Sequence, residues 1–107
     1  MPSPKDRYAG RPLLMLLDNY VLSCLGHLSQ DNEAGLLSAT QRVYGGGSDW
    51  KATLRAALHL SESIDESFRK MWKTNQQRAK QAGVTLTPLD FARMVVDQNF
   101  AHLIQKL

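Results

Sequence analysis

Five basic residues and no acidic residue lie in the stretch 69–80. They are Arg69, Lys70, Lys73, Arg78 and Lys80. Because lysine and arginine neutralise phosphates, a helix with this composition could follow the backbone of a nucleic acid. A second explanation needs no ligand. The predicted helix over 63–82 also carries Asp65 and Glu66 near its start, so acids precede bases along it, which complements the helix dipole. We favour the second explanation and keep nucleic-acid binding as the alternative function.

Three histidines are candidates for metal ligation: His27, His59 and His102. A site on one helix needs ligands three or four residues apart, joined by further carboxylates, thiolates or imidazoles. The three histidines fall on three different predicted helices, and within those helices only Cys24 lies at such a spacing, three residues before His27. One cysteine and one histidine are half a site, so we expect no metal and no cofactor.

Cys24 is also the only cysteine and therefore the only candidate thiol nucleophile. A reactive thiol needs a base and a polar, accessible surrounding. Helical spacing places Cys24 beside Leu17 and Leu28 on an apolar face, which predicts a small buried side chain instead. No catalytic motif is present elsewhere in the sequence, so we expect no enzyme activity.

Gly45–Gly47 followed by Ser48 could bind an anion through free backbone N–H groups at a helix start. A phosphate-binding loop would also need a lysine and a preceding strand. Neither is present, so we interpret this glycine run as a flexible turn.

The apolar composition of the chain favours the helices that would position these side chains. Leu, Ala and Met number 16, 10 and 4, whereas the β-branched Val and Ile together number 7. Straight-chain and γ-branched side chains lose little rotamer freedom in a helix, and β-branched ones favour strands. The composition therefore predicts an all-α fold. A chain of 107 residues is the length of one domain, which we place at 12–107 after a flexible tail at 1–11.

Apolar spacing and capping residues predict a compact bundle of four to five helices, with consecutive helices antiparallel. The expected ranges are 12–29, 32–44, 48–60, 63–82 and 88–106. The caps expected at the last four starts are Asp31 or Asn32, Ser48, a Ser63–Glu66 capping box, and Thr87 followed by Pro88 and Asp90. Gly83 is expected to end the fourth helix.

Two features concern how the helices face. The apolar residues of 12–29 cover about half of its circumference, which predicts a central helix packed by more than one neighbour. On the predicted helix 48–60, by contrast, Lys51, Arg55 and His59 are expected to face solvent.

Three apolar residues fall among polar ones. Met15 and Leu22 lie on the polar side of the helix 12–29, and Met94 lies on the polar side of the helix 88–106. Exposed apolar surface is typical of protein interfaces, and methionine suits adaptable ones. Scattered surface hydrophobes or complete burial of the first helix would explain them equally well. Our functional hypothesis is a small helical protein-interaction module that docks a protein partner or a second copy of itself, with a dimer favoured.

The compartment follows from the remaining counts. A single cysteine cannot form an internal disulfide, and no apolar run is long enough to span a membrane. The stretch Leu13–Leu25, preceded by basic residues, could be a secretory signal, but Asp18 and Asn19 interrupt it. We therefore predict a cytoplasmic protein without a membrane partner. A net charge of +3 permits nucleic-acid binding without requiring it.

Overall fold

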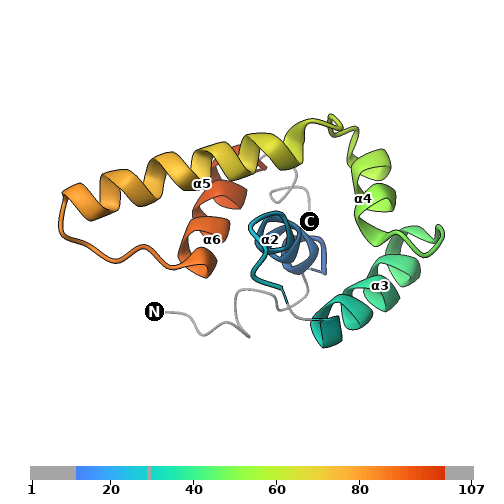
Figure 1. Ribbon diagram of the computed structural model, residues 1–107. Helices are drawn as coiled ribbons and strands as arrows, with labels where there is room; N and C mark the ends of the chain where they lie inside the picture. The colour runs from blue at the N-terminus through green and yellow to red at the C-terminus, as the bar shows by residue number, and fades with distance from the viewer. Residues whose placement is uncertain (1–11, 29, 101–107) are drawn as a thin grey trace.

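The computed structural model describes residues 12–28 and 30–100, which form helices and contain no strand (Figure 1). The helices are α2 (Pro12–Cys24), α3 (Gln30–Tyr44), α4 (Trp50–Leu58), α5 (Ile64–Gln81) and α6 (Pro88–Asn99). The predicted all-α bundle of four to five helices is confirmed. The last helix was predicted to run from 88 to 106 without a break, but α6 ends at Asn99, where Phe100 (φ −119°, ψ 17°) leaves the helical conformation. The predicted tail at 1–11 and the residues after 100 lie outside the described part of the chain.

Helix α2 lies at the centre of the bundle. It packs against α3, α5 and α6, and α4 packs against α3 (Figure 1). Leu16 and Val21, near the middle of α2, have no exposed surface. Burying a side chain of this size contributes about 1.5–3 kcal/mol, so the wide apolar arc of this helix accounts for its central position, as predicted.

The end of α2 differs from the prediction. The helix stops at Cys24 instead of continuing to residue 29. Gly26 adopts a left-handed backbone conformation (φ +77°), and the His27 N–H donates to the Leu22 carbonyl at 3.0 Å. This is the glycine-terminated ending in which a left-handed residue lets the chain satisfy the last carbonyls of the helix.

Three expected caps are also wrong. Helix α3 already begins at Gln30, so Asp31 and Asn32 lie inside it. Asp49, not Ser48, caps α4 by accepting a hydrogen bond from the Ala52 N–H at 3.0 Å. Ser63 makes no capping hydrogen bond, because its backbone (φ −82°, ψ 0°) is not in the extended conformation that such caps adopt.

The connection from α5 to α6 follows the prediction. Gly83 is left-handed (φ +71°) just after α5. The Thr87 side chain then accepts a hydrogen bond from the Asp90 N–H at 3.1 Å, with Pro88 at the start of α6. These contacts fix where α5 ends and where α6 turns back toward α2.

Candidate functional site

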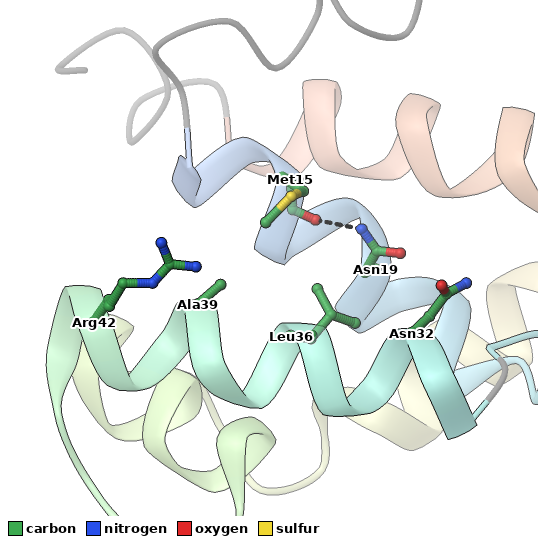
Figure 2. Close-up of a pocket in the computed structure, with 7 residues that line it drawn as sticks. Met15, Asn19, Asn32, Leu36, Ala39 and Arg42 are labelled. Atoms are coloured by element: carbon green, nitrogen blue, oxygen red, sulfur yellow. Dashed lines mark hydrogen bonds between the residues drawn. The ribbon is translucent and has the colours of Figure 1, made fainter.

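A groove runs along the surface between α2 and α3 (Figure 2). It has a volume of about 500 Å³ and is open to solvent on one side. Its lining residues are Met15, Asn19, Asn32, Gly35, Leu36, Ala39 and Arg42. Figure 2 shows side chains from both helices directed into it. The α3 side of the groove carries two of the smallest residues, Gly35 and Ala39.

The groove is apolar in the middle and polar at its ends. Leu36 and Ala39 are buried, and Met15 is half-buried against the same core. Asn32 lies at one end of the α3 wall and Arg42 at the other (Figure 2). An occupant would therefore meet an apolar floor along its length and a cation at one end.

Arg42 and Asn19 supply the polar chemistry of the groove. Arg42 is exposed, and none of the ion pairs between residues of the described ranges 12–28 and 30–100 includes it. Asn19 donates a hydrogen bond from Nδ2 to the Met15 carbonyl oxygen at 2.8 Å, which holds the amide against the α2 wall (Figure 2). The guanidinium thus supplies a solvent-exposed positive charge at this end of the groove.

Gly35 keeps the groove open. A Cβ atom added at this position would meet no other atom within 4 Å, so the space above the glycine is free. Gly35 has an ordinary helical backbone, and glycine in a helix costs about 0.5–1 kcal/mol relative to alanine. The residue therefore lowers the stability of α3, while it lets another backbone approach α3 closely.

A second hollow extends the groove toward the end of α3. Its lining includes Pro12, Met15 and Val43, and its volume is about 290 Å³. Val43 is 45% exposed, and the adjacent Tyr44 is 37% exposed. The apolar surface thus continues out of the groove onto the end of α3.

The three residues predicted to form an interface lie on α2 and α6. Met15, Leu22 and Met94 are all half-buried and pack against the hydrophobic core. Only Met15 lines the groove. Leu22 lies seven residues further along α2, about 10 Å from Met15 along the helix axis.

The five basic residues of α5 are all exposed. Lys70 forms an ion pair with Glu66, with Nζ and Oε1 3.5 Å apart. Arg69, Lys73 and Lys80 lie four and seven residues apart, so they share one stripe of the helix. Among the described residues, no ion pair involves these three. This stripe is the surface available to a polyanion.

A half-buried polar cluster that joins α2, α4 and α5 was not predicted. Tyr20, with 1% of its surface exposed, donates its hydroxyl hydrogen bond to Asp65 Oδ1. Lys51 Nζ lies 3.2 Å from Asp65 Oδ2, and Arg55 Nη1 donates to the Tyr20 hydroxyl at 3.1 Å. Because Tyr20 and Asp65 are 45 residues apart, only the folded structure reveals their contact.

The expectation that Lys51 and Arg55 face solvent is wrong. Their side chains are 20% and 24% exposed, and both point toward Asp65. Lys51 Nζ also lies 4.9 Å from the centre of the Tyr20 ring. The start of α5 covers this side of α4 and supplies the carboxylate that compensates both cations. His59 is exposed as expected.

Burial and hydrogen bonding set the protonation of this cluster. Burial and the hydrogen bond to Asp65 raise the pKa of Tyr20 far above its usual value. Burial raises the pKa of Asp65, but the hydrogen bonds from Tyr20 and Lys51 outweigh it and leave the pKa below its usual value. Tyr20 is therefore neutral and Asp65 ionised at neutral pH, a combination that holds three helices together.

Cys24 borders the cluster, with its Sγ accepting from Lys51 Nζ at 3.7 Å. Burial raises the pKa of its thiol to about 11, even though the nearby Lys51 charge lowers it. The thiol is 5% exposed, and the prediction of a buried Cys24 is confirmed.

The histidine candidates do not form a metal site in the described part of the chain. The His27 ring meets Trp72 edge-on, with ring centres 6.3 Å apart. Within residues 12–28 and 30–100, no group of three or more potential ligand side chains is placed to hold a metal ion. His102 lies outside that range.

Gly46 is left-handed (φ +87°), and a Cβ atom there would lie 2.6 Å from Thr53 Oγ1, so this turn requires a glycine.

Comparisons with known proteins found no similar sequence or structure. The chain matches no protein family, no curated protein and no solved structure. No helix in the described part of the chain is long and apolar enough to cross a membrane.

Proposed function

We propose that this protein is a small cytoplasmic protein-interaction module that binds a helical segment in the groove between α2 and α3. The segment belongs either to a partner protein or to a second copy of the chain. The proposal assigns the protein no catalytic activity and no cofactor. The observation that carries it is an open groove with an apolar floor, a glycine on its wall and an exposed arginine at one end.

The shape and chemistry of the groove fit a helix. Amphipathic helices bind by placing apolar residues, three or four positions apart, into hydrophobic grooves. Met15, Leu36 and Ala39 provide such a floor. Gly35 lets the bound backbone come close, and Arg42 can pair with an acidic residue on the bound helix. A complex of this kind is stabilised by burial of the floor and is oriented by the arginine.

Site-specific photo-crosslinking tests the proposal. A photoreactive amino acid is placed at Val43, which is 45% exposed and lines the hollow that extends the groove, and in a control at the exposed Thr74 of α5. The two proteins are irradiated in cells of the source organism. We expect discrete protein adducts at position 43 and only background at position 74. Equal labelling at the two positions would contradict the proposal.

Nucleic-acid binding by α5 is the second candidate function. The exposed stripe of Arg69, Lys73 and Lys80 favours it, because cations at regular intervals on one rigid helix can each contact a phosphate. Affinity for a generic DNA duplex would then fall with salt, with a logarithmic slope of about −0.9 for each phosphate neutralised. Absence of binding at low salt would eliminate this function.

A further inference from the structure

We propose that the occupant of the groove is α3 of a second copy of the chain, packed antiparallel in a twofold symmetric dimer. This inference rests on the proposed function and names its partner. Three observations carry it: the order of residue types along the groove wall, the free space above Gly35, and the distribution of charge along α3.

The groove wall of α3 is suited to pairing with itself. Asn32, Gly35, Ala39 and Arg42 line the groove at spacings of three, four and three residues. An antiparallel pairing centred between Gly35 and Ala39 maps this row onto itself, with small residues opposite small residues and Arg42 opposite Asn32. A twofold interface requires such a self-complementary surface. The pairing therefore satisfies the twofold symmetry with the two small residues, Gly35 and Ala39, at its centre.

The small residues set how closely the two copies of α3 can approach. Helix axes pack 8–10 Å apart depending on the side chains at the contact. Gly35 has no side chain, and the space above it is free; Ala39 has only a methyl group and is 8% exposed. With these residues at the crossing point, the second α3 can reach the floor formed by Met15 and Leu36 (Figure 2).

Charge favours the antiparallel direction. The sequence of the first turns of α3 contains Asp31 and Glu33, and its last turn contains Arg42. Antiparallel pairing brings each Arg42 to the acidic end of the other copy. Parallel pairing would instead place the two Arg42 side chains side by side, where like charges repel. Within the described residues Arg42 has no ion pair of its own, so pairing in the dimer would not replace one.

Sedimentation velocity tests the dimer, with Gly35→Gln and Ala34→Gln as a matched pair. Ala34 is exposed and absent from the groove lining, so the same side chain is added inside the groove in one variant and outside it in the other. Glutamine favours helix more than glycine does, so Gly35→Gln folds. We expect wild type and Ala34→Gln to change from 12.0 kDa to twice that mass with rising concentration, and Gly35→Gln to remain monomeric.

Charge reversal and cross-linking test the antiparallel direction. Arg42→Glu should weaken dimerisation by about tenfold or more, the equivalent of 1.4 kcal/mol, and adding Glu33→Arg should restore it. Asn32→Cys mixed with Val43→Cys should form a disulfide between copies. Val43→Cys alone should not, because twelve residues of helix rise would separate the two thiols by about 18 Å. Cross-linking of Val43→Cys alone would overturn the antiparallel arrangement.

The outcomes separate this inference from the function on which it rests. A wild-type protein that remains monomeric at every concentration overturns the dimer. If position 43 photo-crosslinks to a different protein, the groove binds a partner and the proposed function stands. If neither occurs, both proposals are wrong. Equal dimerisation of Gly35→Gln and Ala34→Gln would show that the dimer forms through another surface and would also overturn the inference.

Discussion

The Tyr20 hydroxyl makes the sharpest prediction about stability. It is the contact point of α2, α4 and α5, because it donates to Asp65 and accepts from Arg55 at 3.1 Å. Tyr20→Phe removes the hydroxyl and leaves the ring in its contacts with Trp50 and Phe68. The change therefore isolates the hydrogen bonds from the packing.

The size of the effect follows from the charges involved. A hydrogen bond to a charged group contributes about 1.5–3 kcal/mol to stability. Asp65 keeps Lys51 at 3.2 Å and is 22% exposed, so it is not left without a partner when the hydroxyl is removed. We therefore expect Tyr20→Phe to lower the free energy of unfolding by an amount near the lower end of that range, about 1.5 kcal/mol.

Urea denaturation monitored by tryptophan fluorescence measures this loss, because Trp50 packs edge-on against Tyr20. The matched control is Tyr44→Phe, since Tyr44 is 37% exposed and forms no hydrogen bond through its side chain within the described residues. We expect the control to change stability by less than about 0.5 kcal/mol. Equal losses in the two variants would refute the idea that the polar cluster holds the three helices together.

Three further predictions concern pH, the glycine turn and the thiol. The pKa of Asp65 is below its usual 3.8 in the folded protein, so its carboxylate stabilises the fold above pH 3.8 and this contribution is lost as the pH falls below that value. Urea midpoints measured across acidic pH should show this loss in wild type and much less of it in Asp65→Asn. Gly46→Ala should destabilise the protein by about 1–2 kcal/mol, because alanine is strained in a left-handed conformation and its Cβ would lie 2.6 Å from Thr53 Oγ1. The control Gly47→Ala should not destabilise it, because position 47 has free space and no positive φ. Equal urea midpoints for the two variants would contradict this prediction. Cys24, with a pKa of about 11 and 5% exposure, should react with a thiol reagent at neutral pH much more slowly in the folded protein than in urea, and equal rates would mean that the thiol is accessible.

Local signals in the sequence predicted the fold well. Thr87, Pro88 and Asp90 are neighbours in the chain, so their capping geometry needs no information from the rest of the protein. Apolar spacing likewise identified the central helix, because the width of an apolar arc depends only on positions within the helix. The end of α2 was missed because Gly26 fits equally well on a polar helical face and in a left-handed ending.

Contacts between distant segments could not be predicted in this way. Lys51 and Arg55 lie on the polar side of α4, and nothing within α4 indicates that Asp65 of α5 covers them. The groove has the same origin. Met15 was singled out for lying on the wrong side of its helix, but its role depends on Gly35 and Ala39 of α3, whose position relative to α2 only the folded chain determines.

The mass of the photoadduct formed at residue 43 tests the central claim most directly. If the groove binds a helical protein segment, irradiation converts the 12.0 kDa chain into discrete heavier species, at twice that mass where the occupant is a second copy. The same label at Thr74 gives no such species. Adducts that are equally abundant at the two positions, or absent from both, would contradict the account.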